Sequence, residues 1–307
     1  MNYLQCPNFT AARWSLRDRM KTHGMPVSVE SWQGMATAGR PDMRTHELLN
    51  VTLHVPLNGG YETSPVPPTL PHFRQDIQPN LPWADAHFEE RVGGIPLNPA
   101  PSWKDWPWAL SAAKFHDANE TFDHTYPERF WPRWAGITKM YNAKKAAKRA
   151  PKQQAVDERA TTPAELDILH RNEDAAPNEG IRFPYGDLMD VVRLLVREPH
   201  TRQAFLPIFF PEDTSPHAKR KPCTLGYQFI MREAKLHCVY FMRSCDLVRH
   251  WADDAYLAVR LLLWVLNTCK NVELQKDDPI LWHNTTPGSL TMHMTSLHIF
   301  ENDRRTL

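Results

Sequence analysis

The sequence has no long hydrophobic run. Its longest unbroken stretch of aliphatic or aromatic residues covers residues 261–266, far short of the roughly 20 apolar residues that a membrane span needs. Residues 1–20 carry charges where a secretory signal would be apolar. We therefore expect a cytoplasmic protein with no membrane partner.

An excess of charge of one sign is also missing. The chain has 36 Lys and Arg against 35 Asp and Glu, a net charge of +1, so it lacks the global field that would hold a nucleic acid. Its five cysteines include no CxxC pair, which argues against a zinc site or a disulfide scaffold and favours free thiols. We expect no nucleic-acid partner and no bound metal.

What the chain does have is enough apolar material to fold. Of its 307 residues, 42% are hydrophobic and 10% aromatic, which is ample for a packed core. The 27 prolines and 11 tryptophans indicate many turns and extended connections rather than a helical bundle. A Lys-rich run at residues 144–159 opens a polar stretch that predicts either a solvated surface or a contact for phosphates.

Outside residues 223–246, which are considered below, hydrophobic spacing predicts four helices and two strands. The helices are expected at residues 11–22, 83–92, 187–197 and 251–267, the last apolar nearly all round and therefore buried. The strands are expected at residues 204–210 and 47–55, the latter with Leu49, Val51, Leu53 and Val55 on one face. The prolines between residues 59 and 82 predict no regular structure there.

The most informative stretch is residues 223–246, where two runs of β-type residues flank residues 232–235. This pattern predicts a hairpin in which Met231 faces Leu236. Carried along both strands, that register places Cys223 opposite Ser244.

The same register places Thr224 opposite Arg243, at a cross-strand separation of about 5 Å. A guanidinium is thereby brought beside the Cys223 thiol, where it would stabilise the reactive thiolate. The alternative is a buried cysteine at a strand end, with an arginine that pairs with a carboxylate elsewhere.

The residues of this hairpin resemble the thymidylate synthase superfamily. In that family a strand carrying "PC…QF" is followed by "L…RS.D" and a buried helix, and a later strand carries "H.Y". The corresponding residues here are Pro222, Cys223, Gln228, Phe229, Leu236, Arg243, Ser244, Asp246 and His298. The match is good over about residues 182–267 and weak in the N-terminal third.

The resemblance implies an α/β (α+β) fold, a thymidylate synthase-like mixed sheet with flanking helices. It implies a single domain over residues 1–307 with a surface insertion at about residues 140–179. It further implies a homodimer that pairs through the sheet faces.

The chemistry of the family explains why a cysteine is needed. Adding a thiolate to C6 of a pyrimidine makes C5 nucleophilic toward a one-carbon electrophile, which the resemblance identifies as 5,10-methylenetetrahydrofolate. Cys223 would be that nucleophile. The residues implied to bind the nucleotide substrate are Arg243, Ser244, Gln228, His298 and Arg202, the last contributed by a partner subunit; two arginines suit a phosphate dianion.

Other assignments follow from the resemblance alone. Tyr185 resembles the family's active-site tyrosine, and Trp131 and Trp134 resemble its paired tryptophans near the folate. Asp246 would contact the folate side. The glutamate that organises water and proton transfer would be Glu90 or Glu89, and the alternative for either is a solvated helix carboxylate. These residues are Tyr185, Trp131, Trp134, Asp246, Glu90 and Glu89.

One departure from the family bears on the base. Asp254 stands eight residues after Asp246, where thymidylate synthases have an asparagine and deoxycytidylate hydroxymethylases have this aspartate. A carboxylate accepts from the cytosine 4-amino group but cannot donate to uracil O4, so cytosine is the expected base. The alternative is that Asp254 caps the helix that begins near Trp251. Thr224 and Phe300 depart from the family's histidine and tyrosine, which leaves ribose against deoxyribose open.

The resemblance therefore implies folate-dependent conversion of dCMP to 5-hydroxymethyl-dCMP, in the manner of a bacteriophage enzyme acting in its host's cytoplasm. A dCMP C5-methyltransferase and a CMP or dUMP hydroxymethylase remain as enzyme alternatives. A catalytically silent relative that binds nucleotides is the alternative from another class.

Overall fold

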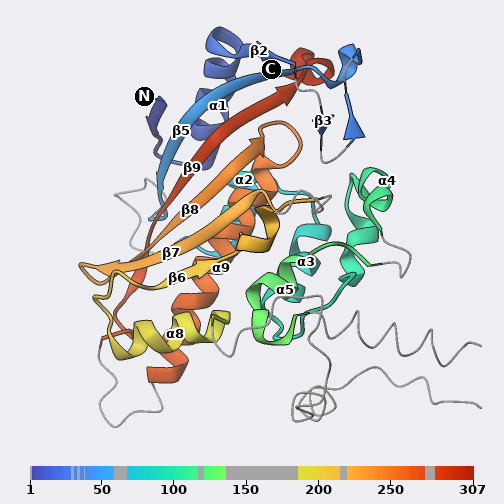
Figure 1. The fold of residues 1–307 in the computed structure, drawn as a ribbon. Helices are drawn as coiled ribbons and strands as arrows, with labels where there is room; N and C mark the ends of the chain where they lie inside the picture. The colour runs from blue at the N-terminus through green and yellow to red at the C-terminus, as the bar shows by residue number, and fades with distance from the viewer. Residues whose placement is uncertain are drawn as a thin grey trace, which may run out of the picture.

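The computed structural model describes residues 2–28, 31–32, 35–37, 39–58, 68–116, 121–135, 186–214, 220–273 and 281–307. These residues form a mixed α/β fold around a seven-stranded sheet (Figure 1). The sheet order is β1-β5-β9-β8-β7-β6, with β2 also paired to β5. Its strands are β1 (Asn2–Gln5), β2 (Met25–Val27), β5 (Thr45–Pro56), β6 (Phe205–Pro207), β7 (Thr224–Arg232), β8 (Lys235–Asp246) and β9 (Thr286–Phe300).

The sheet is mixed because β1 runs parallel to β5 and β8 runs parallel to β9, whereas the other pairings are antiparallel. A separate two-stranded ribbon joins β3 (Ser31–Trp32) to β4 (Met35–Ala36). The predicted mixed sheet with flanking helices is thus confirmed. The predicted insertion at about residues 140–179 lies outside the described residues.

The four predicted helices are present as α1 (Phe9–His23), α3 (Trp83–Val92), α8 (Leu188–Arg197) and α9 (Trp251–Glu273), the last extending six residues beyond its predicted end. The structure adds three helices that were not predicted, α2 (Leu70–Ile77), α4 (Ala109–Ala112) and α5 (Tyr126–Phe130). Short 3₁₀ turns are η1 (Pro41–Met43), η2 (Pro101–Asp105), η3 (Ala113–Phe115), η4 (Pro132–Trp134), η5 (Pro211–Thr214) and η6 (Glu301–Thr306). No helix in the described part of the chain is long and apolar enough to cross a membrane.

Helix α2 corrects the expectation that prolines exclude regular structure between residues 59 and 82. Pro71 lies in the first turn of this helix, where its missing N–H would have no partner within the helix in any case. The helix ends at Ile77 and is capped by Gln78, which adopts a left-handed backbone conformation with φ 54°. A proline disrupts the interior of a helix but is compatible with its first turn.

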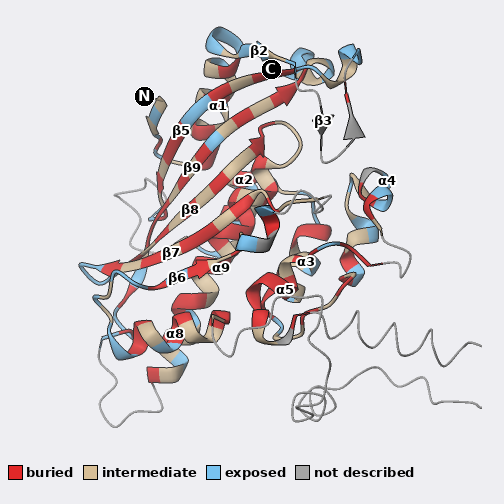
Figure 2. Cartoon of the chain, in the orientation of Figure 1, coloured by how far each residue is buried: buried red, intermediate tan, exposed pale blue. Residues whose placement is uncertain are grey.

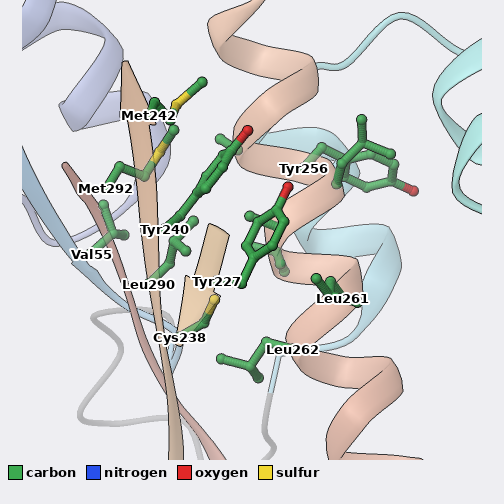
Figure 3. Packing of buried hydrophobic residues seen from close by; sticks show 14 of the residues in the cluster. Val55, Tyr227, Cys238, Tyr240, Met242, Tyr256, Leu261, Leu262, Leu290 and Met292 are labelled. Carbon is green, nitrogen blue, oxygen red and sulfur yellow. The ribbon is translucent and has the colours of Figure 1, made fainter. Parts of the chain in front are cut away.

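Helix α9 packs along one face of the sheet and forms the centre of the core (Figures 1 and 3). The rings of Tyr227 and Tyr240 stack with centroids 4.4 Å apart, between the strands and the helix. Leu262 of α9 points toward the strands in Figure 3, and both Leu261 and Leu262 are fully buried. The all-round apolar sequence of this helix is therefore explained by burial.

The hairpin of β7 and β8 has the predicted turn. Glu233 and Ala234 both have positive φ, 51° and 54°, as a two-residue type I′ turn requires. The predicted register holds from Gly226 to Arg232. It then shifts by one at Leu225, so that Thr224 pairs with Met242.

The predicted pairing of Cys223 with Ser244 and of Thr224 with Arg243 was therefore wrong by one residue. The carbonyl of Cys223 accepts from the backbone N–H of Arg243, at 2.9 Å. A bulge adds one residue to one strand only, and no residue pattern in the sequence marked it.

Buried and more exposed residues alternate along the central strands (Figure 2). The alternation breaks at residues 48–50 of β5, 243–244 of β8 and 295–296 of β9. On β5 the buried residue is Leu48 while Leu49 is 47% exposed, so the predicted apolar face was wrong at Leu49. Asn50 adopts φ 53° at this point. Beyond the same break Ser244 on β8 and Ser296 on β9 turn toward a cavity.

Candidate functional site

A cavity of about 700 Å³ lies where β8, β9 and β5 meet α3, the start of α9 and the segments 100–115 and 122–126. Six residues singled out in the sequence line it: Cys223, Arg243, Ser244, Asp246, Asp254 and His298. The described residues hold no cluster of three or more histidine, cysteine or acidic side chains suited to a metal ion. The cavity is therefore the candidate functional site.

Cys223 is half-buried and lies just before β7. Its Sγ atom is 3.8 Å from Nη2 of Arg243 and 3.5 Å from Oγ of Ser244. Arg243 is fixed in this position because Nε donates to the carbonyl of Pro222 at 2.8 Å and Nη2 donates to that of Lys221 at 2.9 Å. A cation and a hydroxyl thus face the sulfur, and both stabilise negative charge on it.

The tyrosine that the structure places near Cys223 is Tyr126, whereas the sequence predicted Tyr185 as the active-site tyrosine. Its hydroxyl is 3.1 Å from Oγ1 of Thr224, which in turn is 2.8 Å from the hydroxyl of Tyr240. Burial and the nearby Cys223 raise the pKa of Tyr126, so it stays protonated. Tyr185 lies outside the described residues.

Asp254 is half-buried in the first turn of α9 and faces the cavity. Burial raises its pKa to about 7, and the positive charge of Arg91 opposes that rise. Its Oδ2 accepts from the thiol of Cys245 at 3.8 Å. The backbone N–H groups of Val248 and Arg249 bind a different carboxylate, that of Asp246.

The neighbouring aspartates have different partners. Asp253 accepts from the backbone and the side-chain amide of Asn80, each at 2.8 Å. Asp246 is buried, which raises its pKa, and its Oδ2 has no hydrogen-bond partner. Across the β8 and β9 pairing Asp246 lies opposite His298, whose pKa burial lowers to about 4. The same Oδ2 lies 3.8 Å from Nε of Arg249, so Asp246 offers the cavity an acceptor that is ion-paired but not hydrogen-bonded.

One side of the cavity is aromatic. The rings of Trp83 and Trp106 lie 5.9 Å apart, and Trp106 stacks on His250 at 5.3 Å. We call this set the aromatic compartment; its members are Trp83, Trp103, Trp106, Trp108, Phe115 and Phe122. The run SWKDWPW at residues 102–108 was the signal in the sequence that could have identified it.

Of the two tryptophans predicted to lie near the folate, Trp131 lies elsewhere. Trp131 is buried outside the cavity lining, and its indole N–H donates to the carbonyl of Arg91 at 2.8 Å. The side chain of Trp134 lies outside what the structure describes.

Helix α3 presents Trp83, His87 and Arg91 to the cavity, at the four-residue spacing of one helix face. The two glutamates selected in the sequence face elsewhere. Glu90 accepts from the backbone N–H of Ser102 at 2.7 Å and from its hydroxyl. Glu89 is 68% exposed in its side chain and forms an ion pair with Arg260.

Arg202 and Gln228 are in contact with each other, and neither lines the cavity. Nε2 of Gln228 donates to the carbonyl of Arg202 at 2.8 Å. Arg202 is exposed, and Gln228 alternates with the buried Tyr227 and Phe229, so its side chain lies on the sheet face opposite α9.

The comparisons with known proteins agree with the fold. No family model and no curated protein matches the chain. Among solved structures the chain is similar to thermostable thymidylate synthase A from Bacillus subtilis, with a TM-score of 0.54 and 12% identity over 96% of this chain and 81% of that chain. The protein therefore has a thymidylate synthase-like fold.

Proposed function

We propose that the protein transfers a one-carbon unit from 5,10-methylenetetrahydrofolate to C5 of a cytidine nucleotide, and that its reaction converts dCMP to 5-hydroxymethyl-dCMP. The observation that carries the proposal is the meeting of Cys223, Arg243 and Asp254 in one cavity. The similarity of fold to a thymidylate synthase supports it, because that enzyme acts on the same position of a pyrimidine ring.

Cys223 acts as the nucleophile. Its thiolate forms a bond to C6, and the electron pair of the C5–C6 double bond becomes available at C5. After C5 has acquired the one-carbon unit, loss of the C5 proton and departure of the thiolate restore the double bond. Overall, dCMP, methylenetetrahydrofolate and water give hydroxymethyl-dCMP and tetrahydrofolate.

Arg243 and Ser244 hold the nucleotide phosphate beside the nucleophile. Arg220 and Lys221 also line the cavity, and the carbonyl of Lys221 accepts from Arg243. Fork-shaped guanidinium groups bind phosphate oxygens in pairs. Arg202 completes this set from a partner subunit.

Asp254 reads the base. Its carboxyl accepts from the cytosine 4-amino group, and a proton shared with N3 completes the pair. Because burial has already raised the pKa of Asp254 to about 7, both charge states are accessible at neutral pH. The hydrogen bond from Cys245 keeps the carboxyl in place.

The residues present fit the folate cofactor. A pterin is a flat ring with N–H donors; the aromatic compartment offers faces for stacking, and Oδ2 of Asp246 offers a buried acceptor that has no hydrogen-bond partner. When bound, methylenetetrahydrofolate supplies a carbon at the oxidation level of formaldehyde.

The test is mass spectrometry of the products after dCMP, CMP and dUMP are each offered with methylenetetrahydrofolate. We expect dCMP to gain CH₂O, and the Cys223→Ser variant to give no product. A gain of CH₂ instead would identify a methyltransferase. No change in any nucleotide, from folded protein, would contradict the proposal and favour a silent nucleotide-binding protein.

A further inference from the structure

Three hydroxyl groups form a chain that runs from the cavity into the core. The hydroxyl of Tyr126, which lines the cavity, is 3.1 Å from Oγ1 of Thr224, and that oxygen is 2.8 Å from the hydroxyl of Tyr240. Thr224 and Tyr240 are fully buried and lie behind the cavity lining. A buried hydroxyl is unfavourable unless it is hydrogen-bonded. We call Tyr126, Thr224 and Tyr240 the hydroxyl relay.

The bulge in β7 brings Thr224 into the relay. Residues three apart in a regular strand lie on opposite faces of the sheet, which would separate Thr224 from Tyr227. The register shift at Leu225 adds one residue, and Thr224 thereby lies on the same face as Tyr227 and Tyr240. The rings of these two tyrosines stack at 4.4 Å, and Figure 3 shows their hydroxyl oxygens at the same end. The bulge therefore directs a hydroxyl toward Tyr240 that a regular strand would direct away from it.

The protons of the relay follow from its surroundings. Burial raises the pKa of Tyr126 and of Tyr240, so both keep their protons. Thr224 has one proton and can donate it to only one of the two tyrosines. Tyr240 lies in the apolar core, where the described residues offer its proton no acceptor beyond the neighbouring hydroxyls. Tyr240 therefore donates to Thr224 and Thr224 donates to Tyr126, which leaves the proton of Tyr126 for the cavity.

A cation covers the ring of the same tyrosine. Cζ of Arg91 lies 3.9 Å from the ring centre of Tyr126, within the range of a cation–π contact. This guanidinium and the hydroxyl of Thr224 both stabilise electron density on the phenol oxygen. That oxygen accepts one hydrogen bond from Thr224 and keeps a second lone pair for the cavity. Tyr126 can therefore take a proton from a ligand while it releases its own.

We propose that Thr224 and Tyr240 are positioning residues that orient the hydroxyl of Tyr126 for transfer of the C5 proton. The inference rests on the proposed function for the reaction. Once the one-carbon unit is on C5, the C5 proton passes to the oxygen of Tyr126, and the proton of Tyr126 passes to water. The electron pair of the C5–H bond restores the C5–C6 double bond as the thiolate of Cys223 leaves.

The first test needs no substrate. Carbon-13 NMR of tyrosines labelled at Cζ reports the hydrogen bonds of each phenol, and the Tyr126 signal is assigned by its loss in Tyr126→Phe. We expect this signal to move in Thr224→Val, which exchanges the hydroxyl for a methyl group, and to stay near the wild-type position in Thr224→Ser. Thr52→Val is the matched control. Thr52 is a buried strand residue whose hydroxyl lies 3.0 Å from Nδ1 of His293, outside the cavity lining.

Tyr240→Phe tests the relay from its other end and keeps the ring in the core. It should also move the Tyr126 signal, because the two hydroxyls are joined through Thr224. An unmoved Tyr126 signal in folded Thr224→Val or Tyr240→Phe would overturn the proposal.

The second test measures the reaction. In Thr224→Val we expect kcat for dCMP to fall about ten- to a hundredfold, whereas the KM for dCMP stays near the wild-type value because Thr224 does not line the cavity. Deuterium at C5 of dCMP should slow this variant more than it slows the wild type, since transfer of the C5 proton has become limiting. Thr224→Ser should restore both values.

An isotope effect that is the same in Thr224→Val and the wild type would overturn the role in proton transfer. If the wild type converts no nucleotide while the Tyr126 signal moves as expected, the proposed function fails, and the orientation of Tyr126 by Thr224 and Tyr240 stands.

Discussion

Cys223 has two neighbours that stabilise negative charge on its sulfur, Arg243 at 3.8 Å and Ser244 at 3.5 Å. If this sulfur adds to C6 of the base, the C5 hydrogen becomes exchangeable even without folate. We expect tritium release from C5-labelled dCMP by the wild type alone and none by Cys223→Ser, because a serine hydroxyl is a far weaker nucleophile. Cys269→Ala, which removes a buried thiol outside the cavity lining, is the control. Release by the serine variant would mean that another group attacks.

In the proposed function a single side chain, that of Asp254, determines the choice between dCMP and dUMP. In Asp254→Asn an amide replaces the carboxyl, and it can donate to uracil O4 while accepting from N3–H. A buried polar group left unpaired costs about 1–3 kcal/mol, so we expect the dCMP to dUMP ratio of kcat/KM to fall by about ten- to a hundredfold. Asp253→Asn is the matched control, since that carboxylate binds Asn80. An unchanged ratio in folded Asp254→Asn would contradict cytosine reading.

At the scale of elements, the segment that carries the aromatic compartment is anchored by a residue outside the cavity. Glu90 of α3 binds both the backbone N–H and the hydroxyl of Ser102, which belongs to η2 together with Trp103. Ser102 is buried, so its N–H would have no partner in Glu90→Ala. We expect that variant to lose about 1–3 kcal/mol of unfolding free energy. We also expect the substitution to raise the KM for folate more than it raises the KM for the nucleotide.

Glu89→Ala is the control for this prediction, because its carboxylate is mostly exposed. Exposed substitutions of this kind change stability by about 0.5 kcal/mol or less. Chemical denaturation and steady-state kinetics measure both effects. Equal effects of the two alanine variants would show that Glu90 does not anchor η2.

The same elements explain which site residues the sequence could predict. Cys223 immediately precedes β7, Arg243 and Asp246 lie on β8, and Asp254 lies on α9. These elements follow one another along the chain, so the spacing of the four residues in sequence fixes their spacing in space. The bulge at Leu225 still shifted the predicted register by one residue, because it changes the pairing without changing residue type.

The other half of the site comes from segments distant in sequence. Tyr126 and Trp106 reach the cavity from a short helix and a loop region, and their positions depend on packing against α3 and α9 rather than on spacing. Arg91 was missed for a different reason. An arginine on an amphipathic helix is usually solvated, and only the tertiary structure shows it buried over Tyr126.

At the scale of the whole molecule, one face of the sheet carries α9 and the other presents apolar side chains. On that second face Phe241 of β8 stacks on His293 of β9 at 5.3 Å and lies 6.2 Å from Phe205 of β6, which is 40% exposed. Apolar area of this kind gains free energy when it is covered. We propose that a second copy of the chain covers it.

Arg202 lies at the edge of this same face, because Gln228 on the face donates to its carbonyl and its side chain is exposed. In a two-fold dimer each Arg202 would then serve the phosphate site of the partner subunit. Arg202→Ala and Cys223→Ser are each expected to be inactive as homodimers, whereas a heterodimer of the two has one site with both wild-type groups. Random exchange of equal amounts makes half of the dimers heterodimers, so activity should return to about a quarter of the wild-type value. Light scattering confirms that the mixture is dimeric. If dimers exchange and no activity returns, each site is built from one chain, and Arg202 has no part in binding phosphate across the dimer.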